Sequence, residues 1–240
     1  MSTKGLQASP GVPPSLPAVW RGLTTEPGTG VLVVTHEGQI QYANAQAARI
    51  FLGKPNGHGA MIGVNVSDLF PQAWVDERRA LFDAIQRGGG HQIVRTIWRG
   101  YQVFSCIQGI EAATPTKGRR YDRFIIISRR CRQIPSMGRA RPSPEQYIES
   151  KVASLGPLDS LSEREIEVLA LIAQGLSAKE IAAKLHRSVR TIEGHRLMIG
   201  RKLKTDDRVQ LAEMAFRAGL SPRDADRIRL KPLQTDTQRS

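Results

Sequence analysis

Residues 161–204, LSEREIEVLALIAQGLSAKEIAAKLHRSVRTIEGHRLMIGRKLK, decide the fold of the last third of this 240-residue chain. Ser162-Glu-Arg-Glu165 has the spacing of a capping box, in which two side chains satisfy free backbone N–H groups at a helix start. The same spacing returns in Ser177-Ala-Lys-Glu180. The stretch therefore predicts one helix after each serine, with Gly175 ending the first.

Two further helices are expected after these. Ser188 is placed to cap a third helix that runs to about Lys204. A fourth is expected over 207–218, capped by Asp206 and ended by Gly219. Two short helices joined by a tight turn form a helix-turn-helix, whose second helix enters the major groove of DNA. The residues expected on the buried sides of the first three helices are Ile166, Leu169, Ala170, Ala173, Ile181, Ala182, Leu185, Val189, Ile192, Ile199 and Leu203.

The charge of the whole chain also favours a nucleic-acid partner. It has 35 Lys and Arg against 22 Asp and Glu, a formal net charge of +13, which favours nucleic acid ahead of acidic membranes as a partner. A basic protein that is merely soluble is the alternative. Two cysteines are too few for a disulfide framework, and neither a long apolar run nor a secretory signal is present. We therefore expect a cytoplasmic protein that does not enter a membrane.

Residues 28–131 have the mixed pattern of an α+β domain. Apolar, β-branched stretches predict strands, and the first two form a hairpin around a turn at 36–38. Asn44 is placed to cap a helix that ends near Gly53. The predicted strands are 30–35, 39–42, 93–98, 101–110 and 123–128, and the predicted helices are 45–51 and 74–87. Two strands, then helices, then three strands imply an antiparallel sheet.

The opening of this region is GVLVVTHEGQIQYANAQAAR, residues 30–49, in which two strands flank a glycine turn and lead into a helix opened by Asn and small residues. With this segment, Ile62-Gly63 and residues 68–71, the region resembles the PAS sensory fold. The resemblance implies a module that binds a ligand, dimerises or contacts a kinase. The cofactor stays unknown, because the histidines, His36, His58 and His91, are expected at the surface and Cys106 as a small core residue.

Three motifs in the C-terminal part are specific together: LSEREIEVL at 161–169, GLSAKEIA at 175–182 and RTIEGHR at 190–196. With them the region closely resembles the DNA-binding domains of the LuxR/FixJ family, and the last motif is similar to the FixJ branch. From Arg187 to Lys204 there are six basic residues and one acid, a surplus that suits phosphate contact. The resemblance and this surplus give the predicted DNA-binding residues: Ser177, Lys179, Arg187, Ser188, Arg190, Thr191, Glu193, Gly194, His195, Arg196, Leu197, Arg201 and Lys202.

Three positions depart from the family pattern. Many relatives carry lysine where Glu193 and Leu197 stand, so no base preference is carried over. Glu193 would accept a hydrogen bond from a cytosine amino group or form an ion pair with Arg190 or Arg196. His195 would contact DNA, or pack or form a hydrogen bond within the domain. His186 stands in the inter-helix turn where relatives have Gly, and histidine tolerates a left-handed backbone better than most residues.

We expect five segments along the chain: a flexible leader at 1–27, a PAS-like sensory or dimerisation domain at 28–131, a basic linker at 132–155, a tetrahelical helix-turn-helix domain at 156–220 and a weakly ordered polar tail at 221–240. A short joining helix is predicted at 145–154. Residues 117–141 hold nine basic side chains and one acidic one, either as a solvated linker or as an aid to DNA binding.

The sequence thus predicts a transcription regulator that reads double-stranded DNA as a homodimer under control of the PAS-like domain. On the fourth helix, we expect some of Val209, Leu211, Met214, Ala215 and Phe216 to pack on the domain and the rest to form a dimer seam. RNA polymerase or a sensor kinase are further partners considered. The alternative is a protein-interaction module that uses the helix-turn-helix without reading DNA. The sequence contains no nucleophile–base pair, no metal-ligand spacing and no phosphate-binding loop, so no motif in it indicates an enzyme.

Overall fold

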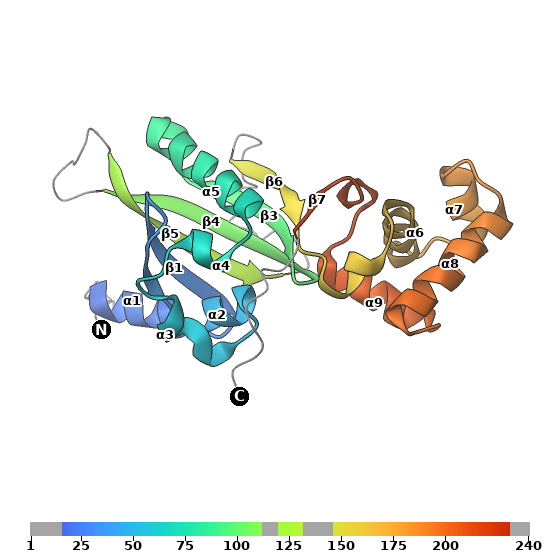
Figure 1. The fold of residues 1–240 in the computed structure, drawn as a ribbon, viewed down its shortest axis with the longest axis horizontal. Helices are drawn as coiled ribbons and strands as arrows, with labels where there is room; N and C mark the ends of the chain where they lie inside the picture. Colours follow the sequence, from blue (N-terminus) through green and yellow to red (C-terminus); the bar gives the residue numbers. More distant parts are fainter. Residues whose placement is uncertain (1–15, 112–119, 132–145, 231–240) are drawn as a thin grey trace, which may run out of the picture.

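The computed structural model describes residues 16–111, 120–131 and 146–230. Within them a mixed sheet with helices beside it adjoins a helical bundle (Figure 1). The strands are β1 (Thr29–Thr35), β2 (Ile40–Ala43), β3 (Gln92–Trp98), β4 (Tyr101–Glu111), β5 (Tyr121–Arg130), β6 (Tyr147–Ala153) and β7 (Ile228–Arg229). The α-helices are α1 (Leu16–Thr25), α2 (Ala45–Phe51), α3 (His58–Met61), α4 (Val66–Leu69), α5 (Gln72–Ala84), α6 (Glu163–Ala173), α7 (Ala178–Lys184), α8 (Val189–Leu203) and α9 (Arg208–Ala218).

The sheet has the strand order β2-β1-β5-β4-β3-β6-β7. Its first five strands are antiparallel neighbours, and the hairpin of β1 and β2 pairs Val33 with Tyr42. Helices α2 to α5 follow β2 in the chain and precede β3. This is the order of two strands, helices and three strands that the sequence predicted, so the α+β, PAS-like fold of this part is confirmed.

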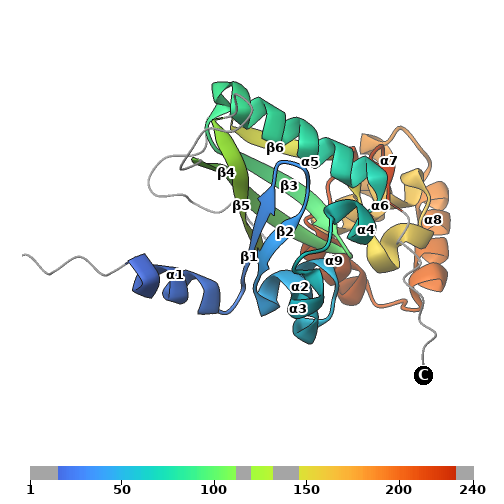
Figure 2. The same ribbon diagram turned by 60° about the vertical axis from the view of Figure 1, so that its left-hand side comes forward.

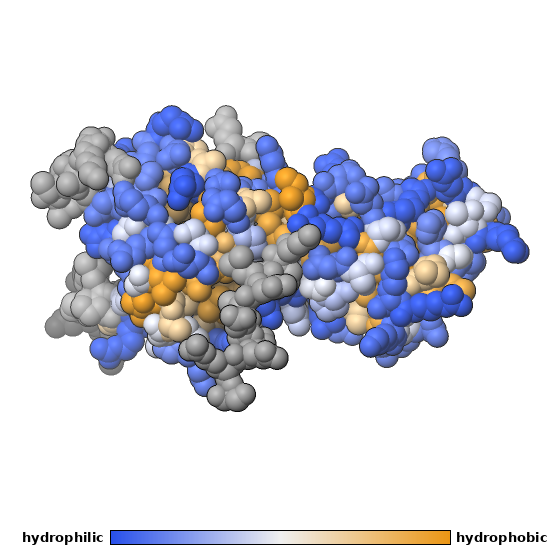
Figure 3. Space-filling model, viewed as in Figure 1, coloured by the Kyte–Doolittle hydropathy of each residue, from blue (hydrophilic) through white to orange (hydrophobic). Residues whose placement is uncertain are grey.

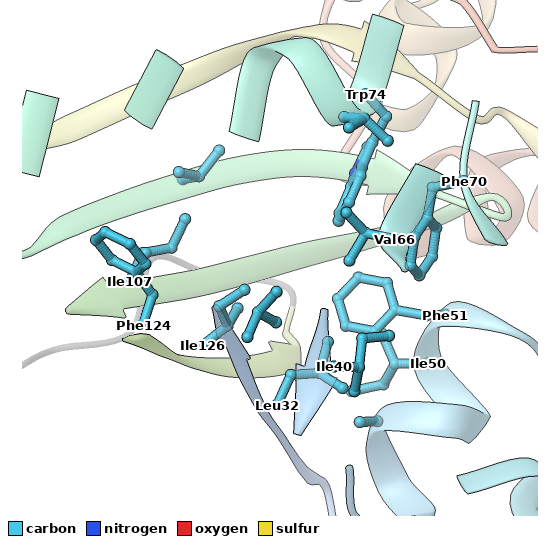
Figure 4. Close-up of a cluster of buried hydrophobic side chains, with 14 of the residues drawn as sticks. Leu32, Ile40, Ile50, Phe51, Val66, Phe70, Trp74, Ile107, Phe124 and Ile126 are labelled. Atoms are coloured by element: carbon cyan, nitrogen blue, oxygen red, sulfur yellow. The ribbon is translucent and has the colours of Figure 1, made fainter. Parts of the chain in front are cut away.

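The core of the PAS-like part lies between the sheet and helices α2 to α5. Figure 4 shows Phe51, Phe70 and Trp74 from the helical side facing Leu32, Ile107 and Ile126 from the strands. The Phe70 and Trp74 rings stack with centroids 4.4 Å apart, and Phe51 meets Phe70 edge to face at 5.8 Å. Figure 2 shows α5 running along the sheet. Aromatic side chains therefore pack against one another and against aliphatic side chains between the layers.

The joining helix predicted at 145–154 is wrong, because this segment forms strand β6. It pairs in parallel with β3, with Val94 opposite Ile148, and so covers an edge that would otherwise expose unpaired backbone groups. The β-branched Ile148 and Val152 suit a strand, and Val152 is buried. The range 132–155 therefore includes part of the sheet, while residues 132–145 lie outside the described residues.

Two other expected segments contain more regular structure than predicted. The leader at 1–27 includes helix α1, on which the Trp20 ring lies 5.3 Å from that of Tyr42, while residues 1–15 lie outside the described residues. The tail at 221–240 returns to the sheet through a 3₁₀ turn, Pro222–Asp224, and strand β7, which pairs in parallel with β6. Leu230 is buried in the core, and residues 231–240 are not described.

A buried ion network holds this returning segment. Asp224 has a fully buried side chain, and its carboxylate lies 3.1 Å from Arg95 Nη1 and 2.5 Å from Arg227 Nε. Arg95, on β3, also donates to Glu149 on β6 at 2.7 Å and to the carbonyl of Gly219 at 2.5 Å. Burial alone would raise the pKa of Asp224, but its bonds to Arg95 outweigh this and the pKa lies below its usual value. The network joins the end of α9 to the sheet.

Among the described residues, no helix is long and apolar enough to cross a membrane.

Candidate nucleic-acid interface

The helical bundle is framed by the two predicted capping boxes. Ser162 N–H donates to Glu165 Oε2 at 2.7 Å, and Glu165 N–H donates back to Ser162 Oγ at 3.3 Å. At the start of α7, the Ser177 N–H donates to Glu180 at 2.8 Å, and the return bond is 3.3 Å. Both pairs satisfy N–H groups that the first turn of a helix leaves free. The predicted starts of α6 and α7 are confirmed.

The turn between α7 and α8 depends on a left-handed residue. His186 has φ +52°, the conformation that glycine would adopt with less strain. Arg187 N–H donates to the carbonyl of Ala182 at 2.9 Å, and Arg164 of α6 donates to the carbonyl of Leu185 at 3.2 Å. The turn is thus held from within and from the neighbouring helix, which fixes the angle at which α8 leaves α7.

Helix α8 begins where predicted. Ser188 Oγ accepts from Thr191 N–H at 3.0 Å. On its inner side Ile192 and Ile199 are buried against the core of α6, and Leu203 is partly buried. Val189 was predicted to be buried, but 45% of it is exposed because it lies in the first turn, beyond the edge of that core. The fourth helix starts one residue later than expected, since Asp207 rather than Asp206 caps it.

The outer side of α8 carries most of the predicted DNA-binding residues. Arg190, Gly194, Leu197 and Arg201 follow one another at helical spacing and are exposed, on the side opposite Ile192 and Ile199. Thr191, Glu193 and Lys202 are also exposed, and His195 and Arg196 are half-buried. Arg187 and Ser188 in the turn, and Ser177 and Lys179 at the start of α7, are exposed as well. Figure 3 shows this end of the molecule as mostly hydrophilic, with small apolar areas over α8.

Two predicted contact residues have partners inside the bundle. Glu193 Oε2 lies 3.7 Å from Arg196 Nη1, so of the two pairings considered the structure has the one with Arg196. Lys202 Nζ lies 2.6 Å from Glu165 Oε2. Burial would raise the pKa of Glu165, but its bonds to Lys202 and Ser162 outweigh this and lower it. Lys202 thus ties the end of α8 to the start of α6.

Sequence reasoning missed one exposed residue on the outer side of α8 and one arginine of α9 that bonds the turn after α6. Met198 is 42% exposed beside Leu197, and an apolar side chain here can contact a thymine methyl group. The run Leu197-Met198 between basic residues was the available signal. Arg208 of α9 donates to the carbonyls of Gly175 and Leu176, both at 3.1 Å. No local pattern links Arg208 to a turn more than thirty residues away.

The core of the PAS-like part contains a small cavity. A cavity of about 20 Å³ lies among Leu32, Val34, Trp74, Phe82 and Ile126, room for about one water molecule. Trp74 Nε1 is buried there without a hydrogen-bond partner among the described residues. His36 lies 3.0 Å from Asp83, a local pairing rather than a metal site, and no group of metal-binding side chains occurs in the described ranges.

A family model and two relatives match the chain. The model described as bacterial regulatory proteins, luxR family, matches residues 159–215. The transcriptional regulatory protein LiaR of Bacillus subtilis is 33% identical over 106 residues, 39% of this chain and 50% of LiaR. The oxygen regulatory protein NreC of Staphylococcus aureus is 27% identical over 176 residues, 70% of this chain and 74% of NreC. The chain therefore spans half the length of LiaR.

A solved structure is similar over most of the chain. It is the Vibrio cholerae VqmA–ligand–DNA complex, 16% identical, with a TM-score of 0.48, covering 93% of this chain and 98% of that one. The matched family and the two relatives are regulatory proteins, which agrees with the expectation that the chain is not an enzyme. Residues 159–215, which match the model of the luxR family of bacterial regulatory proteins, contain a helix-turn-helix, joined in this chain to a PAS-like domain.

Proposed function

We propose that the chain is a transcription regulator that binds specific sites on double-stranded DNA through α8. The observation that carries this is the outer side of α8, where exposed Arg190 and Arg201 flank Gly194 and Leu197 on a helix fixed at both ends. The predicted residues from Ser177 to Lys202 would form the contact surface. Arginines would bind phosphates or guanine, and the free N–H groups near Ser188 would face a phosphate.

The protein would act as a homodimer. On α9, Leu211 and Ala215 pack into the bundle, whereas 73% of Val209 and 48% of Phe216 are exposed. An apolar pair on one helix is suited to a two-fold seam, and a dimer would read two half-sites about one turn of DNA apart. Val209→Glu should shift the mass measured by multi-angle light scattering from dimer to monomer. A wild type that stays monomeric with and without DNA would refute the dimer.

Control by the PAS-like domain is the third element of the proposal. The sheet runs without interruption from β3 through β6 to β7, and Arg95 bonds both Asp224 and Gly219 beyond α9. A change in the sheet would therefore reach the helical bundle through packed and hydrogen-bonded groups. The proposed domain bounds are 28–131 and 156–220, with β6 and β7 bridging them.

Selection from genomic fragments in a gel-shift assay tests the proposal. Full-length protein should retain a small set of fragments in the presence of competitor DNA. Arg190→Gln and Arg201→Gln should each lose this retention, while Arg223→Gln, an exposed arginine after α9, should keep it. Retention of no fragment, with regulation intact in both variants, would instead support a protein-interaction module.

A further inference from the structure

A second hollow in the structure lies away from α8, between the PAS-like part and the segment that leads to α6. Its volume is about 680 Å³, within the range of small-molecule sites. Its walls come from six places: the end of α2, the end of α4, the turn between β3 and β4, the end of β5, residues 154–159 and Leu230. Figure 1 shows these elements meeting where the sheet adjoins the helical bundle. We call this hollow the junction groove.

The junction groove is strongly basic. Arg49, Lys54, Arg99 and Arg130 line it, against one acid, Asp159. That carboxylate accepts from the Leu155 N–H at 3.2 Å, so it is already engaged in the backbone turn. Within the described ranges, no carboxylate lies within ion-pair distance of any of the four cations. Four neighbouring positive charges without a counter-charge favour an anion.

Arg130 forms the inner wall of this cluster. Its Nη2 donates to the carbonyls of Arg49 and Ile50 at 3.2 and 3.4 Å, and its Cζ lies 4.2 Å from the centre of the Tyr101 ring. Its Nε is buried and has no hydrogen-bond partner among the described residues. Burial lowers the pKa of Arg130, Tyr101 offsets part of this, and the neighbouring charges of Arg99 and Arg49 lower it further. An anion in the groove would relieve this repulsion.

Arg99 is held in place by close backbone contacts. It has φ +54°, which is uncommon outside glycine. A Cβ on Gly53 would lie 2.7 Å from Arg99 Nη2, and one on Gly156 would lie 2.8 Å from the Arg99 carbonyl carbon. The glycine at 156 lets the chain approach the Arg99 backbone closely, and the glycine at 53 leaves space that the Arg99 guanidinium occupies.

Apart from Ser154 and Asp159, the rest of the lining is mostly apolar. It includes Leu52, Leu69, Pro71 and Pro157, with the Tyr101 ring next to Arg130. Arg130 and Arg217 already lie over the Tyr101 ring, with Cζ 4.2 and 5.7 Å from its centre. Guanidinium groups bind phosphate in a bidentate fashion, and a flat ring can stack on a guanidinium and lie against the apolar lining. We infer that the junction groove binds a small phosphorylated molecule that carries a flat ring, of the nucleotide class, with its phosphates on Arg99, Arg130 and Lys54.

Isothermal titration of the full-length protein tests this without DNA. The probes are ADP, pyrophosphate, adenosine and citrate. ADP should bind most tightly, pyrophosphate more weakly, and adenosine and citrate weakest. Lys54→Gln and Arg99→Gln should each weaken ADP binding by about tenfold or more, since bonds to charged groups are worth that much. Both side chains belong to exposed residues, so these variants should fold.

Arg87→Gln serves as the control, because it removes one exposed arginine from the far end of α5 without touching the groove. Its ADP affinity should equal that of the wild type. Absence of heat with ADP and pyrophosphate at millimolar concentration would overturn the inference, as would equal ADP binding by Lys54→Gln, Arg99→Gln and wild type. If ADP bound no more tightly than pyrophosphate, the inference that the ligand carries a flat ring would be wrong. If citrate bound as tightly as ADP, the inference that the groove selects phosphate would be wrong.

Discussion

Removal of the charge on Asp224 should destabilise the whole protein. This carboxylate is fully buried between Arg95 and Arg227, whose side chains are 8% and 9% exposed. Asp224→Asn keeps the volume of the side chain but leaves two buried guanidinium groups short of a counter-charge. Breaking a buried ion pair in this way costs about 3–5 kcal/mol. Glu149 still bonds both arginines, so we expect the lower end, about 3 kcal/mol.

Urea unfolding followed by tryptophan fluorescence measures this loss, because Trp74 and Trp98 are buried in the sheet core. Asp226→Asn, two residues away and exposed, is the matched control and should change the free energy of unfolding by less than about 0.5 kcal/mol. A double-mutant cycle with Arg95→Met should show coupling between the two sites. If Asp224→Asn were as stable as Asp226→Asn, the network would not hold the bundle to the sheet.

Three further predictions concern the caps, the turn and acid. Ser162→Ala removes the acceptor for Glu165 N–H and should lower the free energy of unfolding by about 1 kcal/mol in urea. His186→Gly relieves the left-handed strain, and part of this gain is offset by the extra chain entropy of glycine in the unfolded state. The free energy of unfolding should therefore rise by about 1 kcal/mol in thermal melts. Asp224 and Glu165 have lowered pKa values, so their stabilisation is complete above about pH 4 and is lost as pH falls below it.

Each of these has a control or a result that would contradict it. Ser160→Ala changes an exposed serine that caps no helix and should leave stability unchanged. A melt in which His186→Gly is less stable than wild type would show that the imidazole makes a contact worth more than the strain. For the acid effect, urea midpoints between pH 3 and 6 should fall more steeply in wild type than in Asp224→Asn. Parallel curves would contradict the sign derived from the lowered pKa.

The parts of the fold that depend on local signals could be predicted from the sequence. Ser162, Ser177 and Ser188 begin helices as expected because a cap needs partners only two or three residues away. The hairpin of β1 and β2 and the glycine at 175 belong to the same class of short-range signal. The DNA-binding role of the α8 surface stays a prediction, made from the resemblance to the LuxR/FixJ family and from the basic surplus on this helix.

The parts that depend on distant partners could not be predicted. Strand β6 was taken for a helix because its partner, β3, lies about fifty residues earlier, and parallel pairing has no turn signal. The ion pair of Lys202 with Glu165 was not predicted, because the two residues lie 37 positions apart and no local pattern links them. The bond from Arg95 to Asp224 crosses most of the chain. The basic junction groove combines side chains from six separate segments.

The salt dependence of DNA binding tests the central claim most directly. Fluorescence anisotropy would follow full-length protein on a selected site and on its scrambled copy over a range of salt concentrations. Affinity for the selected site should fall steeply with salt and exceed that for the scrambled copy. If Arg201 contacts a phosphate, Arg201→Gln should reduce the slope of log affinity against log salt by about 1. Equal affinity for both DNAs, or an unchanged slope in Arg190→Gln and Arg201→Gln alike, would contradict DNA reading by α8.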